Sequence, residues 1–263
     1  PEDVHIGNLV TALGAINAGV TTLLDWSHIG NTPEHTDAAI EGLRESGVRA
    51  VYAYGSGAGG PRNQYPQDLR RLRSRFFSSA DQLLTLALAA GSNPADWAVA
   101  RQFDAPITLH LQTTDQLMAV AGAMRPDVTY IHCNQVTESG WKMIADSGGH
   151  VSIACPIEME MGHGVPPIQQ AIDHGIRPSL SVDVETQMAG DFFTQMRSVF
   201  TLQRMLALNR PAGAVGRAPA LLTAREVVEF ATIEGAKDNR LDRKIGTLTP
   251  GKLADITVLS KDI

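Results

Sequence analysis

Seven apolar, strand-like segments alternate with helix-like segments, and this order constrains the fold more than any other feature of the sequence. The strand-like segments are 19–26, 48–54, 83–90, 106–112, 129–134, 151–155 and 177–184. Nearly every pair is separated by apolar residues at helical spacing, which is the pattern of successive βαβ units. Strands of a parallel sheet are covered on both faces and are mostly apolar, as these are. We therefore predict an α/β fold, a (β/α)8 TIM-type barrel whose first strand is missing.

Helix start signals support this reading. Thr32 followed by Pro33 and the capping-box pattern from Thr223 to Glu226 both indicate helix N-termini. The predicted helices cover 2–18, 32–47, 68–79, 94–103, 115–124, 139–147, 168–174, 192–208 and 223–237. The predicted loops and linker are 55–65, 156–167 and 211–219. A doubly wound open sheet is the alternative, but no glycine-rich phosphate turn follows an early strand.

The C-terminal tail differs from the rest of the chain. Residues 245–255 are rich in turn formers and lead to one further strand-like stretch at 256–259, for which the chain offers no partner strand. We expect residues 1–244 to form the barrel and 245–263 to begin a truncated β-sandwich domain. Because the chain opens on Pro1 without Met, we also expect an internal fragment of a longer protein.

The net charge and the positions of the cysteines limit the kinds of partner and the cellular compartment that the sequence predicts. The net charge is −6 and the basic residues are dispersed, so the sequence predicts neither a nucleic-acid nor an anionic membrane partner. No apolar run approaches the ~20 residues of a membrane-spanning helix. Cys133 and Cys155 lie in apolar runs, which favours buried, reduced thiols and a cytoplasmic location. We expect a small-molecule substrate, and the sequence leaves a homo-oligomer open.

Polar residues share one face near the end of three predicted strands. The three sets are Thr108, His110 and Gln112; Tyr130, His132 and Asn134; and Ser179, Ser181, Asp183 and Glu185. Barrel enzymes place their chemistry at these C-terminal strand ends. A catalytic divalent metal takes His nitrogens and a carboxylate and keeps one position open for water. We therefore expect His110 and Asp183 to be metal ligands, and His132 to be a ligand or a base.

The alternative is that these histidines have no role in catalysis and are core residues whose ring nitrogens are hydrogen-bonded. This is the commoner role of a single isolated His on a strand. Two ligands do not make a tight site, and the chain contains no His-x-His pair. The absent first strand is where such a pair would sit. A chain without that pair that binds no metal therefore remains an alternative.

Several stretches together resemble the amidohydrolase superfamily, in particular its branch of cytosine deaminases, S-adenosylhomocysteine deaminases and triazine hydrolases. The stretches are 19–26, the strand ending in His110, 130–134, 179–183 and 245–255. The resemblance covers the whole chain. It implies that His110 is the metal ligand of the fifth barrel strand and that His132, on the sixth, orients or polarises substrate and water. Asp183, on the eighth strand, would contact the metal and accept a proton.

The resemblance also implies one divalent metal, zinc in the first instance with iron as the alternative, and the fragment itself is expected to hold it weakly or to lack it.

Deaminases of this branch usually carry a Glu three residues after the fifth-strand His, where this sequence has Thr113. Glu158, Glu160 or Glu185 would have to replace it. The alternative interpretation gives these residues no role in the site. Glu158 and Glu160 would then lie on a solvated loop, and Glu185 would lie past the end of its strand.

Four residues are candidates for substrate binding. His28 follows the second barrel strand, and His163 lies in the glycine-containing loop after the seventh. Glu158 and Glu185 are the other two. Overall, we expect a metal-dependent hydrolase that acts on C–N bonds of a small cyclic compound, with hydrolytic dechlorination on the same scaffold as the alternative.

Overall fold

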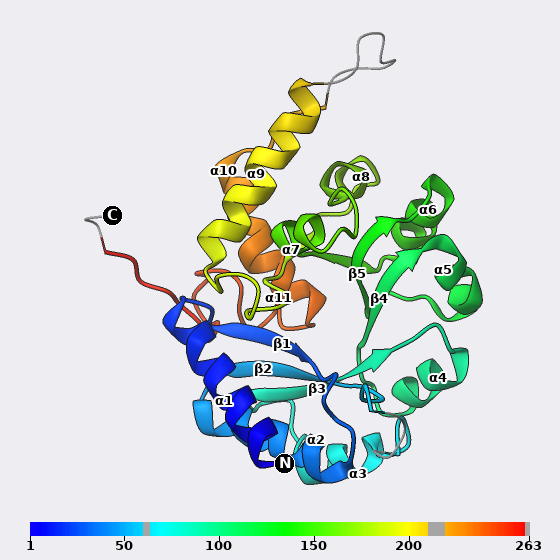
Figure 1. Ribbon diagram of the computed structural model, residues 1–263, viewed down its shortest axis with the longest axis vertical. Helices are drawn as coiled ribbons and strands as arrows, with labels where there is room; N and C mark the ends of the chain where they lie inside the picture. Colours follow the sequence, from blue (N-terminus) through cyan, green and yellow to red (C-terminus); the bar gives the residue numbers. More distant parts are fainter. Residues whose placement is uncertain (60–63, 210–218, 261–263) are drawn as a thin grey trace.

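The computed structural model of the chain describes residues 1–59, 64–209 and 219–260. Seven strands form one parallel sheet in the order β1-β2-β3-β4-β5-β6-β7. They are β1 (Thr22–Trp26), β2 (Arg49–Tyr54), β3 (Leu84–Ala90), β4 (Ile107–Thr113), β5 (Val128–Gln135), β6 (His150–Ile153) and β7 (Ser179–Leu180). The sheet curls into an open (β/α) half-barrel that carries helices on its outside (Figure 1). The predicted fold class is confirmed.

Helices connect almost every pair of strands. They are α1 (Glu2–Asn17), α2 (Pro33–Ser46), α3 (Leu69–Arg75), α4 (Pro94–Gln102), α5 (Thr114–Val120), α6 (Glu138–Ser147), α7 (Cys155–Glu160), α8 (Ile168–Asp173), α9 (Phe192–Leu208), α10 (Ala224–Glu229) and α11 (Gly235–Asp238), with a 3-10 turn at Ala121–Ala123 and a π turn at Phe230–Glu234. The predicted caps form, since Thr32 accepts from His35 N and Thr223 exchanges bonds with Glu226. None of the described helices is long and apolar enough to cross a bilayer.

Two apolar layers hold the barrel together. The outer layer lies between sheet and helices and includes Leu88, Trp97 and Trp141, all buried. The inner layer uses small strand residues such as Ala53 and Ala87, and it is completed by side chains from the segment around α11. Those side chains are Ile233, Ala236, Leu241 and Ile245. The segment around α11 thus fills part of the inside of the barrel.

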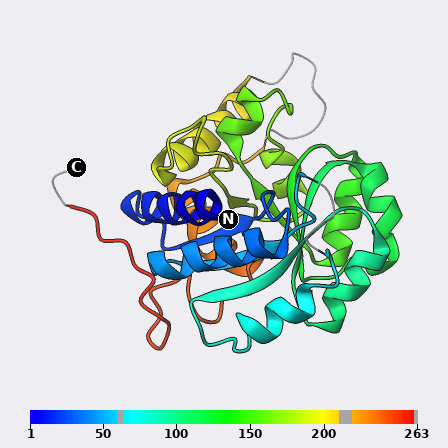
Figure 2. The same cartoon turned by 60° about the horizontal axis from the view of Figure 1, so that its bottom comes forward.

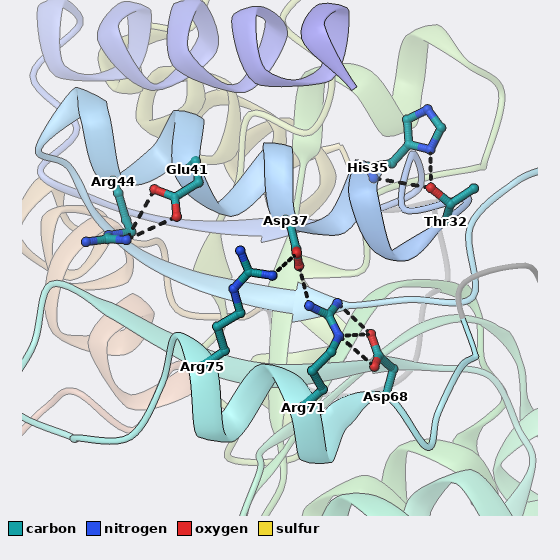
Figure 3. A network of polar contacts seen from close by, with 8 residues as sticks. All are labelled: Thr32, His35, Asp37, Glu41, Arg44, Asp68, Arg71 and Arg75. Carbon is teal, nitrogen blue, oxygen red and sulfur yellow. Dashed lines mark hydrogen bonds and ion pairs between the residues drawn. The ribbon is translucent and has the colours of Figure 1, made fainter.

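Helices α1 and α2 lie side by side on the outside of the first strands (Figures 1 and 2). Gly42 permits their close approach, because a Cβ there would meet the carbonyl oxygen of His5 at 2.5 Å. On the other side of α2, Asp37 accepts from Arg71 at 2.7 Å and from Arg75 at 2.5 Å (Figure 3). Arg71 also binds Asp68, so a partly exposed ion-pair network joins α3 to α2.

Asp25 faces α1 from β1, where Asn8 donates a hydrogen bond of 2.8 Å to its carboxylate. Burial raises the pKa of Asp25 to about 6, against an ordinary value of 3.8, and the Asn8 bond offsets only part of this. The folded chain therefore holds this proton more tightly than the unfolded chain does. The stability associated with protonated Asp25 is complete below about pH 4 and is lost as the pH rises through about 6.

Asp25→Asn is therefore expected to raise the free energy of unfolding at pH 7 by about 1–3 kcal/mol, because the amide carries no charge to desolvate. It should also remove the fall in stability between about pH 4 and pH 7. Urea unfolding across that range measures both effects. Asp104→Asn is the matched control, since Asp104 is exposed. A destabilised Asp25→Asn chain, or one with an unchanged pH slope, would contradict the assignment.

Three predicted elements differ from the structure. The expected loop at 156–167 begins with helix α7, because Pro156 occupies the first turn, where its missing N–H costs nothing. The strand expected at 177–184 is only Ser179–Leu180. The tail strand expected at 256–259 does not form in the described residues, because no neighbouring strand pairs with it. The sandwich boundary at residue 245 remains a prediction, and most of the predicted linker at 211–219 lies outside the described residues.

The expected alternation in β5 is also wrong. Tyr130 and Cys133 both pack into the outer apolar layer, whereas His132 turns toward the candidate site. The reason is a bulge: the register passes from Leu111↔His132 to Thr113↔Gln135, so β5 contains one extra residue. His132 and Cys133 both have positive φ, at 71° and 61°, which breaks the two-residue period.

Candidate active site

Four imidazole rings form a row at the C-terminal ends of the strands. The ring centroids of His28 and His110 are 5.4 Å apart, those of His110 and His132 are 5.4 Å apart, and those of His132 and His163 are 5.0 Å apart. His110 is on β4 and His132 on β5, while His28 follows β1 and His163 follows α7. The parallel sheet therefore brings together all four histidines that the sequence predicted.

A cavity of about 260 Å³ opens beside this row. Its walls come from the ends of β1 to β4 and the loops that follow them. The lining residues are Trp26, Ser27, His28, Gly55, Ser56, Gly57, Ala58, Ala89, Ala90, Gly91, Leu109, His110 and Gln116. Small and apolar groups dominate the lining, which also includes the imidazole rings of His28 and His110. A cavity of this volume suits a small molecule.

The histidines at the cavity are held neutral. Burial lowers the pKa of His110 to about 3, and the nearby imidazole of His132 acts in the same direction. Burial also lowers the pKa of His28, against the opposing charge of Asp183. A neutral imidazole keeps a lone pair on one nitrogen, which is the form that binds a metal ion.

Asp183 lies beyond β7 in a left-handed backbone conformation with φ 67°. Its Oδ2 is 3.8 Å from Nε2 of His132, which places a carboxylate beside the third ring of the imidazole row. Positive φ in a residue other than glycine costs free energy, and such strain is commonly found at functional sites. The short β7 and this turn together aim the Asp183 side chain back toward β5.

Two of the predicted carboxylates, Glu158 and Glu185, are not among the residues that line the cavity. Glu158 is fully buried on α7, and its Oε1 lies 3.0 Å from Nδ1 of His132. The Glu185 carboxylate lies beside Gly14 of α1 and Gly190, outside the residues that line the cavity. Burial raises the pKa of Glu185. Glu160, the third alternative for the missing acid, is exposed.

The donor types fit a divalent metal in part. His110 and Asp183 are a neutral imidazole and a carboxylate, as such an ion requires. Within the described residues, however, no group of three or more His, Cys, Asp or Glu side chains could hold a metal ion. These residues supply part of a ligand set, and a tight site needs additional ligands.

Two residues at the site escaped the sequence reasoning. Trp26 packs edge-on against His110, with ring centroids 4.0 Å apart. The oxygen Oε1 of Gln116 accepts from the backbone N–H groups of Gln112 and Thr113, which fixes the end of β4. The signal for Trp26 was its place at the end of β1, in register with the other strand ends. The signal for Gln116 was its position three residues after Thr113, in the pattern of a capping box.

Comparison with known proteins identifies a family for the chain. The model of the amidohydrolase family matches residues 1–263. The 5-methylthioadenosine/S-adenosylhomocysteine deaminase of Pyrococcus furiosus is 22% identical over 287 residues, covering 98% of this chain and 64% of the relative. The 5'-deoxyadenosine deaminase of Methanosarcina mazei is 24% identical over 285 residues, covering 98% and 62%. The chain thus spans a little under two thirds of the length of these curated relatives.

Solved structures show the same fold. An adenosine deaminase from Xanthomonas campestris with bound zinc superposes with a TM-score of 0.75 at 20% identity, covering 95% of this chain and 60% of that one. A zinc complex of atrazine chlorohydrolase from Arthrobacter aurescens gives 0.75 at 19%, covering 97% and 63%. Since the family model spans every residue, the chain belongs to the amidohydrolase family.

Proposed function

We propose that the full-length protein is a metal-dependent hydrolase that cleaves a C–N bond of a small cyclic compound, as a deaminase does. The observation that carries this proposal is the row of four imidazoles, with the carboxylate of Asp183 near His132 and a small, largely apolar cavity beside His28 and His110. The deaminases among the relatives act on compounds that contain a purine ring. A flat heterocycle of that kind matches the cavity walls formed by Trp26, His28 and His110.

His110 and Asp183 would hold the metal, zinc in the first instance, together with ligands that the described residues do not supply. A divalent metal at such a site lowers the pKa of a bound water molecule toward neutrality. The carboxylate of Asp183 is the group that would accept a proton there. His132, whose Nε2 faces Asp183, would hydrogen-bond to water or substrate. His28 lines the cavity and would contact the substrate, and His163 would close the far end of the row.

Hydrolytic dechlorination is the second candidate, and Thr113 favours it. The resemblance predicts a Glu at this position to protonate a departing amine, but Thr113 ends β4 as the N-cap of helix α5, and its N–H donates to Gln116. A chloride leaving group needs no proton. The atrazine chlorohydrolase has the same fold, which by itself does not decide between the two reactions.

A cytoplasmic location is part of the proposal. The two cysteines, Cys133 and Cys155, are free and buried, as expected in a reducing compartment. Burial raises the pKa of Cys155 to about 12, and the charge of Glu158 acts in the same direction. A thiol with such a pKa is protonated at neutral pH, so we assign these cysteines to packing rather than to catalysis.

Turnover by the full-length, zinc-loaded protein tests the reaction class. Aminopurines, aminopyrimidines, aminotriazines and chlorotriazines are offered, and ammonia and chloride are measured separately. Ammonia release from an amino compound is the expected result, with turnover falling when zinc is chelated and returning when it is restored. Chloride release without ammonia release would replace deamination by the second candidate. No turnover of any of these compounds by zinc-loaded, folded protein would contradict both.

A further inference from the structure

His132 has an unusual backbone that requires support. The bulge in β5 gives His132 and the following Cys133 positive φ, which costs roughly 1–3 kcal/mol at each residue. Cys133 is anchored because its side chain is fully buried in the outer apolar layer. His132 has only 3% of its surface exposed, so its ring must find its polar partners within the protein.

Glu158 supplies that partner from the next βα unit. Its side chain is fully buried, and Oε1 lies 3.0 Å from Nδ1 of His132. The same oxygen accepts the backbone N–H of Ala154 at 2.9 Å. The first turn of α7 therefore fixes the carboxylate from one side while the imidazole meets it from the other. Glu158 itself is not among the residues that line the cavity.

A fixed acceptor beside Nδ1 of His132 determines whether the other ring nitrogen, Nε2, carries a proton or a lone pair. A carboxylate that accepts at Nδ1 keeps the proton of neutral imidazole on that atom. The lone pair then lies on Nε2, which is 3.8 Å from Oδ2 of Asp183 and faces the imidazole row. Carboxylates that bind the second ring nitrogen of a metal-ligating histidine orient the ring, and their loss typically costs 10–100-fold in metal affinity or activity. We expect a loss of the same order where the oriented imidazole acts on water or substrate.

We propose that Glu158 is a positioning residue that holds His132 in the tautomer protonated at Nδ1, with Nε2 presented to Asp183 and the candidate site. Glu158 thus acts through His132 and does not bind the substrate. The expected effect on kcat rests on the proposed function, whereas the tautomer of His132 does not depend on that function. The expected substrate contact of Glu158 is replaced by a contact with the imidazole.

The test compares Glu158→Gln with Glu160→Gln in the full-length protein, because Glu160 lies on the same helix and is exposed. Two-bond proton–nitrogen spectra of the metal-free, 15N-histidine-labelled proteins report which ring nitrogen is protonated, and His132→Asn assigns the signals. Wild-type protein and Glu160→Gln should show His132 protonated at Nδ1. Glu158→Gln should lose this single tautomer, and its kcat should fall about 10–100-fold with KM changed less than threefold.

The wild-type spectrum alone decides the structural claim, even if Glu158→Gln does not fold. A wild-type His132 protonated at Nε2, or a mixture of both tautomers, would overturn the proposal. An unchanged His132 spectrum in folded Glu158→Gln would overturn it as well. The expected change of tautomer with unchanged kcat would support Glu158 as the partner of His132 and would instead refute the catalytic role of His132 in the proposed function.

Discussion

His110→Ala in the full-length protein is expected to lower kcat/KM by about 10³-fold or more. His110 occupies the centre of the site, with its ring between those of His28 and His132 and against Trp26. A metal ion at a hydrolytic site contributes several kcal/mol to the stabilisation of charge in the transition state. Since each 1.36 kcal/mol is a factor of ten in rate, loss of one proposed ligand of that ion is expected to remove about three orders of magnitude.

His5→Ala is the matched control, because it also removes an imidazole that contacts a carboxylate. His5 lies on α1 and pairs with Glu45 of α2 at 3.0 Å, away from the imidazole row. The control should keep its activity within about twofold and should melt within a few degrees of the wild type. His110→Ala should melt at a similar temperature when both proteins are metal-free. Full activity in His110→Ala would remove this residue from the site.

Arg49→Ala is expected to lower the free energy of unfolding by about 3–5 kcal/mol. Arg49 begins β2 and binds Asp255 of the C-terminal tail through two parallel bonds, of 2.8 Å from Nε and 3.1 Å from Nη2. Each side chain is only 10% exposed, and Thr22 donates a third bond to Asp255. Removing the guanidinium leaves a carboxylate desolvated beside the sheet without its countercharge, which is the costly way to break a buried pair.

Two further variants separate the charge from the contact. Arg49→Met combined with Asp255→Leu should recover most of the lost stability, because it removes both charges and keeps the volume. Arg44→Ala breaks an exposed pair with Glu41 on α2 and should cost less than about 0.5 kcal/mol. Urea unfolding of all variants at one pH provides the comparison. If Arg49→Ala costs no more than Arg44→Ala, the tail is not held by this pair.

The fold could be predicted because its determinants are local. Apolar strands alternating with helices, and caps such as Thr32 and Thr223, each depend on a few neighbouring residues. Helix α7 was not predicted because proline and the glycines near Pro156 are typical of loops, although proline also suits a first helical turn. The tail escaped prediction for another reason. Its contact with Arg49 joins residues 206 positions apart, and no local pattern encodes such a pairing.

The sequence indicates which residues gather at the candidate site better than it indicates how they are arranged. His110, His132 and Asp183 converge because the ends of parallel strands meet at one edge, so residue type and strand order were sufficient. The face assigned to Tyr130 was wrong because strict alternation assumes a regular strand, and the bulge at His132 breaks it. The partnership of Glu158 with His132 links two βα units. It becomes visible only when the packing of α7 on β5 is known.

Metal analysis of purified full-length protein and of His110→Ala tests the central claim most directly. Both proteins are dialysed against the same low concentration of zinc, and bound metal is measured per chain by elemental analysis. Wild-type protein should hold about one equivalent of divalent metal, and His110→Ala should hold at least tenfold less, because one ligand of the site is gone. Equal metal content in the two proteins would contradict the assignment of His110 as a metal ligand and, with it, the proposed site.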